Sequence, residues 1–228
     1  LLHVVFFMAE PYRSDAKHLA RGMEYLKQAV DAGCAGALAR YSLYLANGMF
    51  DVPRDLPKSF ELAGAAAAQG DGVGHIILAS FYCNGLAVER DAKKAIEHLE
   101  LALAAGELLA ACHLGDIYAR GFDAIAADKE RALSYYYCAA EAGYAPAQAG
   151  YARLLLERTE CSEKDAGLCL DILENLAGEG NDQAMVALAV ECLTGRHMEK
   201  NPERAEILCE QAAEMGNAEA QRMLEQFA

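Results

Sequence analysis

The chain has 228 residues, of which 54% are hydrophobic, and its 20 basic and 34 acidic side chains give a formal net charge of -14. Such a chain can bury a large core, which excludes extended disorder. The negative charge repels nucleic acid phosphates and anionic lipid surfaces, so we expect no nucleic acid partner and no direct membrane insertion.

The first predicted element is the apolar segment Leu1–Met8 (LLHVVFFM). It is shorter than the roughly 18 residues that a membrane span needs, and it lacks the basic start and cleavage site of a complete signal peptide. Residues 1–13 align with Leu38–Phe50 and are predicted to form a helix that has lost its partner. An unpaired apolar helix indicates a fragment of a longer array, an end covered by another protein, or self-association through Leu1–Met8.

Glycines recur along the chain in two series with one period. Neighbouring first-series glycines are 36 or 37 residues apart: Gly33, Gly70, Gly106, Gly143, Gly180 and Gly216. The second series stands fifteen residues later, at Gly48, Gly85, Gly121 and Gly195, with Arg158 in the remaining place. Glycine just past a helix end supplies the left-handed conformation that stops the helix. We therefore predict a helix A before each first-series glycine and a helix B after it, as in residues 91–105 and 109–120.

Short polar side chains stand near the start of each predicted helix A, where they can cap free backbone N–H groups: Asp55, Asp91, Asp128, Asp165 and Asn201. Pro202 suits a first helical position. Mostly small residues stand four positions before each first-series glycine (Ala29, Ala66, Ala102, Ala139, Leu176 and Ala212) and four positions after it (Ala37, Gly74, Ala110, Ala147, Ala184 and Ala220). They are expected to let the two helices of a hairpin approach closely.

Larger side chains recur at two sites of helix B and are interpreted as packing residues: Tyr41, Leu78, Leu114, Tyr151, Leu188 and Leu224, then Leu45, Tyr82, Tyr118 and Leu155. The motif A-x-x-x-L-G at Ala110–Gly115, followed by Tyr118 and Gly121, and the segment Asp91–Ala95 (DAKKA) resemble the Sel1-like repeat family, a relative of the tetratricopeptide repeats. This resemblance covers nearly the whole chain.

The resemblance implies an all-α, right-handed α-α superhelix, a solenoid of stacked antiparallel helix hairpins with a period of 36–37 residues. We expect one solenoid over residues 1–228. Residues 1–13 would be helix B of an incomplete first repeat, and 198–228 a truncated last repeat. The repeats between them are expected at residues 14–50, 51–87, 88–124, 125–161 and 162–197.

Two departures from the family pattern are visible. The fourth unit lacks its glycine over Leu154–Asp165 (LLLERTECSEKD), which predicts an irregular turn. The tryptophan common in helix A of the family is replaced by residues that predict a repacked interior: Tyr25, Leu62, His98, Tyr135, Ile172 and Leu208. His98 is accordingly interpreted as a packed histidine and not as a ligand.

The eight cysteines do not follow the repeat, which predicts free thiols in a reducing compartment such as the cytoplasm, with the periplasm or export to a host cell left open. Cys169 replaces a small packing residue. No metal-binding motif is present, and Cys112–His113 is a lone adjacent pair more typical of structural cysteine than of a catalytic dyad. We expect no enzyme activity, no cofactor and no metal.

A predicted partner-binding site lies on helix A, at positions nine and six residues before each first-series glycine. These positions share one edge of the helix. The candidate residues are Glu24, Glu61, Glu97, Glu100, Asp171, Glu174 and Glu210, with Tyr137 as an aromatic anchor. Because related solenoids place helix A on the concave face, the row predicts an acidic groove for a basic or mixed basic-apolar protein segment; an ordinary solvated helix face is the alternative.

The resemblance implies a non-enzymatic, bacterial interaction scaffold or adaptor, since such families mostly bind other proteins. One alternative is an immunity protein that neutralises a cognate toxin of a secretion system. A second, from another class, is a hydrolase of penicillin-like compounds, to which some cysteine-rich relatives are linked. The cysteine pairs of that branch are missing from this sequence.

Overall fold

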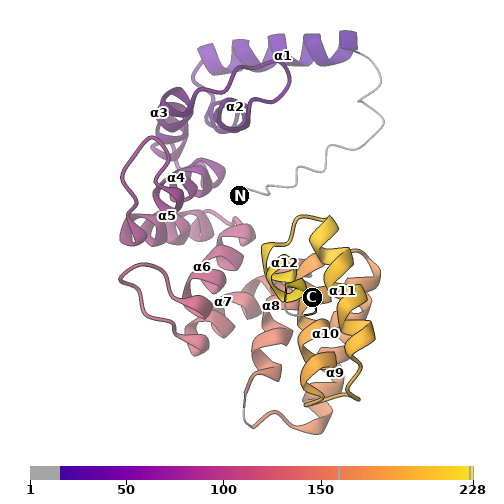
Figure 1. The fold of residues 1–228 in the computed structure, drawn as a ribbon. Helices are drawn as coiled ribbons and strands as arrows, with labels where there is room; N and C mark the ends of the chain where they lie inside the picture. The colour runs from indigo at the N-terminus through magenta and orange to yellow at the C-terminus, as the bar shows by residue number, and fades with distance from the viewer. Residues whose placement is uncertain (1–15, 159, 226, 228) are drawn as a thin grey trace. The chain divides into compact units, whose positions relative to one another are not determined.

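The computed structural model describes residues 16–158, 160–225 and 227, and within these residues the fold is all-α (Figure 1). The twelve helices described are α1 (Ala16–Asp31), α2 (Ala35–Asn47), α3 (Leu56–Ala67), α4 (Gly72–Asn84), α5 (Ala92–Ala104), α6 (Leu108–Arg120), α7 (Lys129–Glu141), α8 (Ala145–Leu156), α9 (Glu163–Gly178), α10 (Asp182–Thr194), α11 (Pro202–Glu214) and α12 (Ala218–Leu224). The predicted helix in residues 1–13 lies outside the described residues.

The chain divides after Ala110, within α6, into two compact units. Odd-numbered helices correspond to the predicted helix A and even-numbered helices to helix B. In the first unit α1 packs on α2, α3 on α4, and α2 on both α3 and α4. In the second unit α7 packs on α8, α9 on α10 and α11 on α12, and α8 contacts both α9 and α10. Each unit is therefore a stack of helix hairpins, as predicted.

The turn after each odd-numbered helix is built from the same two backbone hydrogen bonds. In the first, the N–H of Gly33 donates to the carbonyl of Val30 (2.9 Å) and the N–H of Cys34 donates to the carbonyl of Ala29 (3.0 Å). The same pair of bonds recurs at all six turns. The six glycines have φ angles between 74° and 93°: Gly33, Gly70, Gly106, Gly143, Gly180 and Gly216. This is the Schellman arrangement, and it confirms the predicted helix ends.

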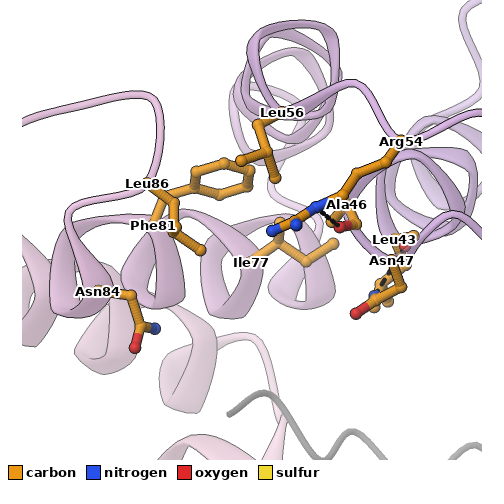
Figure 2. A pocket seen from close by; sticks show the side chains of 9 residues that line it. All are labelled: Leu43, Ala46, Asn47, Arg54, Leu56, Ile77, Phe81, Asn84 and Leu86. Carbon is orange, nitrogen blue, oxygen red and sulfur yellow. Dashed lines mark hydrogen bonds between the residues drawn. The ribbon is translucent and has the colours of Figure 1, made fainter.

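The loop that leads back to the next odd-numbered helix is closed by its capping residue. The N–H of Asp55 donates to the carbonyl of Leu45 (2.9 Å), while the Asp55 carboxylate accepts from the N–H of Lys58 (3.0 Å). Asp91, Asp128 and Asn201 repeat both contacts. In the first of these loops Nε of Arg54 also donates to the carbonyl of Ala46 (3.1 Å; Figure 2). In these four loops one residue thus closes the loop and caps the next helix.

The loop after α8 differs, and the prediction that Asp165 caps α9 was wrong. Ser162 is the cap, and its hydroxyl accepts from the N–H of Asp165 (3.1 Å). Glu157, the residue just after α8, keeps a right-handed backbone (φ -75°), whereas Gly48, Gly85 and Gly195 are left-handed after their helices. The irregular turn is confirmed, and α9 begins at Glu163, before the predicted capping residue.

As predicted, small residues lie where the two helices of a hairpin approach each other closely. Ala66 and Gly74 face each other between α3 and α4, and both are buried. A Cβ atom added at Gly74 would lie 2.8 Å from the nitrogen of Ala67 and 2.9 Å from the Cβ of Ala66. The backbones of these two helices are in contact. This explains why only glycine or alanine stands four residues after each first-series glycine.

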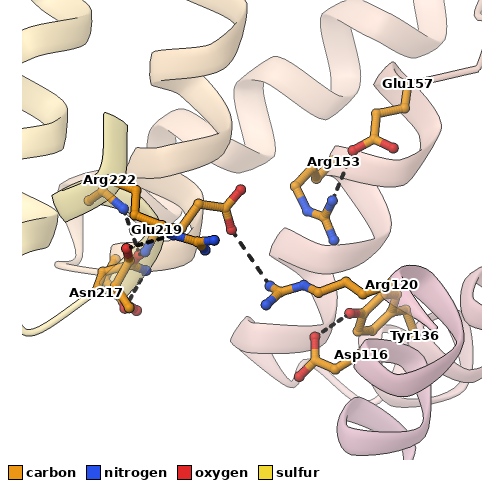
Figure 3. Close-up of polar contacts among 11 residues, drawn as sticks. Asp116, Arg120, Tyr136, Arg153, Glu157, Asn217, Glu219 and Arg222 are labelled. Carbon is orange, nitrogen blue, oxygen red and sulfur yellow. Dashed lines mark hydrogen bonds and ion pairs between the residues drawn. The ribbon is translucent and has the colours of Figure 1, made fainter. Parts of the chain in front are cut away.

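Tyr136 fills the space that two glycines leave beside α7. Cβ atoms added at Gly115 and Gly150 would lie 2.6 Å and 2.7 Å from its ring. The hydroxyl of this buried tyrosine donates to Oδ1 of Asp116 (2.5 Å), and burial together with the nearby carboxylate raises its pKa (Figure 3). Tyr136 therefore ties α7 to α6 and packs against α8.

The recurring large residues mostly form the core, as predicted. Leu78, Leu114 and Leu188 are buried, as are Leu62 and Leu208 at the position of the missing tryptophan. At that same position Tyr25 is 56% exposed, so its predicted interior placement was wrong. Its hydroxyl instead accepts from Nε of Arg21 on the surface of α1 (3.2 Å).

The close approach at Gly74 gives a stability prediction with a matched control. Gly74→Ala should lower the free energy of unfolding by about 1 kcal/mol or more, because the added methyl group meets backbone atoms of α3. Gly64→Ala, also inside a helix but with nothing within 4 Å of the new Cβ, should raise it by about 0.5–1 kcal/mol. Urea denaturation measures both changes, and equal gains in both variants would contradict the packing argument.

Candidate protein-binding surface

The predicted acidic residues of the first unit all lie on odd-numbered helices and are exposed. Glu24 is on α1, Glu61 on α3, and Glu97 and Glu100 on α5. Lys58 donates to Glu61 (2.9 Å), but an exposed pair of this kind contributes only about 0–1 kcal/mol. Among the described residues Glu24 and Glu97 form no ion pair, so their charge faces solvent.

The predicted residues of the second unit are Tyr137 on α7, Asp171 and Glu174 on α9, and Glu210 on α11. Asp171 and Glu210 are exposed. The Tyr137 side chain is 47% exposed, and its hydroxyl donates to Glu141, which raises the pKa of the phenol. Its ring centroid lies 5.7 Å from that of Tyr151 on α8, so one side of the Tyr137 ring is packed against this helix.

Glu174 has a structural contact that sequence reasoning missed. Both of its carboxylate oxygens accept from Nη2 of Arg204 on α11, at 2.6 Å and 2.5 Å, and this contact raises the pKa of Arg204. The pair is half-buried and links two successive odd-numbered helices. Glu174 is therefore partly neutralised, and it contributes less free charge than Asp171 on the same helix.

Exposed apolar side chains accompany the acidic residues on the same helices. Leu101 is 52% exposed on α5, next to Glu100; Leu168 is 61% exposed on α9; and Ile207 is 53% exposed on α11. Periodicity could have identified them, because they stand on helix faces that are otherwise polar. In both units the surface of the odd-numbered helices is thus acidic with isolated apolar side chains.

His98 lies in an aromatic cluster between α4 and α5, in agreement with its predicted packing role. Its ring stacks on Tyr82 (5.7 Å, 10° between planes), and its Nδ1 lies 2.9 Å from Nδ1 of His75. Since one nitrogen must donate and the other accept, at least one ring is neutral at that position. Burial lowers the pKa of both histidines. Asp71 opposes this shift at His75, whereas at His98 the His75 ring and Lys94 add to it and Glu97 opposes it.

The remaining nucleophile and metal candidates do not form a reactive site. Burial raises the pKa of the Cys112 thiol to about 12 and lowers the pKa of His113, so the buried thiol stays protonated and no neighbouring imidazolium stabilises a thiolate. Cys169 is buried, as its packing role predicts. In the described ranges no three His, Cys, Asp or Glu side chains are grouped to hold a metal ion, and no helix is long and apolar enough to cross a bilayer.

Residues 35–71, 73–107, 108–144 and 182–217 match the family model of the Sel1 repeat, which covers more than half of the sequence. The chain belongs to the Sel1 repeat family. Each matched segment begins at or near an even-numbered helix and ends at the turn after the next odd-numbered helix. The unmatched residues 145–181 contain the irregular loop after α8. Sel1 repeats are generally non-catalytic scaffolds that mediate contacts between proteins.

Solved structures support the same fold. A protective antigen of uropathogenic Escherichia coli with a Sel1-like repeat fold is 25% identical over 91% of this chain, with a TM-score of 0.74. The chain spans 44% of that antigen. A Sel1 repeat protein from Oxalobacter formigenes is 25% identical, with coverage of 86% and 80% of the two chains and a TM-score of 0.69.

An immunity protein from Pseudomonas aeruginosa shares the fold at 22% identity, with coverage of 82% of this chain and 66% of the other and a TM-score of 0.53. No curated protein matches the sequence.

The histidine pair predicts a loss of stability in mild acid. Because the folded-state pKa values lie below 6.5, the unfolded chain binds these protons first, so the contribution of the pair is complete above about pH 6.5 and falls as the pH drops through the folded values. Denaturation at pH 7.5 and 5.5 should show a smaller acid-induced loss in His98→Phe than in the unsubstituted protein. An unchanged pH dependence would contradict this assignment.

Proposed function

We propose that this protein is a non-enzymatic adaptor that binds a basic or mixed basic-apolar segment of a partner protein. The observation that carries the proposal is the combination of exposed carboxylates and exposed apolar side chains on odd-numbered helices of both units. Glu97, Glu100 and Leu101 on α5 are the clearest example. Glu24 and Glu61 belong to the same proposed surface in the first unit. The corresponding proposed surface of the second unit consists of Tyr137, Asp171, Glu174 and Glu210, with Glu174 acting mainly through its ion pair with Arg204.

Charge supports this choice of partner. A net charge of -14 attracts a basic segment from a distance and speeds encounter, while apolar side chains such as Leu168 and Ile207 supply contact area once the partner is bound. Because the carboxylates are exposed, their contribution should weaken as salt rises above the physiological range. Binding would be the whole of the mechanism, with the buried hairpin contacts keeping the surface rigid.

A second candidate role is that of an immunity protein that neutralises a basic toxin. The acidic surface favours it, and an immunity protein shares the fold. This role and that of a scaffold use the same kind of surface, so they differ in the identity of the partner. Co-expression with the toxin encoded nearest to this gene separates them: an immunity protein restores growth, whereas a scaffold does not.

Charge reversal tests the proposed surface. Two double variants are made: Glu97→Lys with Glu100→Lys in the first unit, and Asp171→Lys with Glu210→Lys in the second. Each should weaken partner binding by about tenfold or more, because the attraction between the exposed carboxylates and a basic segment becomes a repulsion. The partner is first isolated by affinity capture and mass spectrometry, and its affinity is then measured by biolayer interferometry at two salt concentrations.

The control reverses Glu89 and Glu160, which are exposed in loops and do not belong to the surface. This variant should retain its affinity. Circular dichroism of every variant confirms that the helices remain folded. Unchanged affinity in both test variants, or an affinity that does not depend on salt, would remove the acidic surface from consideration.

A further inference from the structure

A hollow of about 400 Å³ opens in the first unit between the ends of α2 and α4 (Figure 2). Its lining is mainly apolar and comes from α2, α3, α4 and the loops that follow the even-numbered helices: Leu43, Ala46, Asn47, Arg54, Leu56, Ile77, Phe81, Asn84 and Leu86. A volume of this size is at the lower end of the range for small-ligand and peptide side-chain pockets. The hollow is separate from the acidic residues on the exposed faces of the odd-numbered helices.

Arg54 is the one charged residue in this lining, although the chain has more acidic than basic side chains. Nε of Arg54 donates to the carbonyl of Ala46, and Arg54 forms no ion pair with any described residue. A guanidinium has five N–H donors, so its terminal nitrogens remain available to an acceptor. In Figure 2 the guanidinium extends from the side of α2 toward Ile77 and Phe81.

The loop that carries Arg54 is held firmly. Phe50 packs edge-on against Tyr44 (4.8 Å between centroids), Val52 is buried, and the N–H of Asp55 is bonded to Leu45. Phe50 and Asp51 have positive φ angles of 55° and 60°, an uncommon conformation for residues other than glycine. The position of the Arg54 backbone is thus fixed at the rim, which lowers the entropy lost when the side chain binds a ligand.

The equivalent place in the second unit has the opposite character. A hollow of about 60 Å³ between α8 and α10 is lined by Arg153, Glu157, Glu191 and Glu219 among others. Arg153 occupies the repeat position of Leu43 and is already paired with Glu157 (2.8 Å; Figure 3). This hollow is small, and Glu157 already neutralises the charge of its arginine. Of these two hollows, the one in the first unit combines an apolar lining with a cation that is not paired with any described residue.

We propose that this hollow binds a partner segment in which an apolar side chain stands next to a carboxylate side chain. The apolar side chain enters between Leu56, Ile77 and Phe81, and the carboxylate accepts hydrogen bonds from the terminal nitrogens of Arg54. This ligand is opposite in charge to the basic segment proposed for the odd-numbered helices. The hollow is therefore a second site, and it does not depend on the first.

The probe is the peptide acetyl-Gly-Gly-Glu-Phe-Gly-Gly-amide, compared with the same peptide carrying Gln in place of Glu. Binding to the full chain is followed by NMR through the Arg54 Nε–H signal and the methyl signals of Leu43 and Ile77. The Glu peptide should shift these signals, and the Gln peptide should bind about tenfold more weakly, because a charge-assisted contact is lost. Arg54→Ala should weaken the Glu peptide by a similar factor, whereas Arg153→Ala, the matched control, should not.

Arg54→Lys keeps the positive charge and should retain part of the binding, which separates charge from a change in loop structure. Equal affinity for the two peptides, or an affinity unchanged by Arg54→Ala, would overturn the proposal. Tighter binding after Phe6→Ser with Phe7→Ser would assign the hollow to the first residues of this chain, and a dimer that dissociates in Arg54→Ala would assign it to a second copy. Either result also overturns it.

Discussion

The close approach of two helix backbones at each hairpin turn is the constraint on which the rest of the structure depends. Gly74 and Ala66 show how little space is left between α3 and α4, and the six left-handed glycines fix the turn that brings such helices together. A larger side chain at the contact would separate the helices. The glycines and alanines therefore recur in the sequence at the interval at which this helix-helix contact recurs in the structure.

The same constraint determines which surfaces remain for binding. Each hairpin buries its apolar residues against the preceding and following helices, so the outward faces of the odd-numbered helices are left to Glu97, Asp171 and Glu210. In the first unit α2 contacts α4 and in the second α8 contacts α10, and these helices line the hollows beside Arg54 and Arg153. A scaffold of this kind varies its binding properties through surface residues while its turns stay unchanged.

Local features of the fold could be predicted from the sequence. The glycine ends and the caps Asp55, Asp91 and Asn201 depend on a few neighbouring residues, and each was found where it was expected. The cap of α9 was not predicted because this repeat lacks its second-series glycine. The helix begins before the expected capping residue, and Ser162 caps it instead. The acidic candidates were found to be exposed, apart from the half-buried Glu174, but whether they bind a partner stays a prediction.

Contacts between repeats could not be predicted, because no local spacing defines them. Glu174 meets Arg204 thirty residues later, and His75 meets His98 across two helices. Arg54 was not a candidate at all, since a single arginine before a cap has no distinctive pattern. Its significance comes from the apolar residues that α2 and α4 bring around it and from the absence of a carboxylate in that lining.

Amide hydrogen exchange at the residues after the six turn glycines tests the central claim most directly. These amides belong to Cys34, Asp71, Glu107, Tyr144, Asn181 and Asn217. If each donates to the carbonyl of the residue five positions earlier, all six should exchange far more slowly than an unstructured chain, as NMR can measure residue by residue. Exchange of these amides at the rate of an unstructured chain would contradict the repeated turn and, with it, the arrangement of the hairpins.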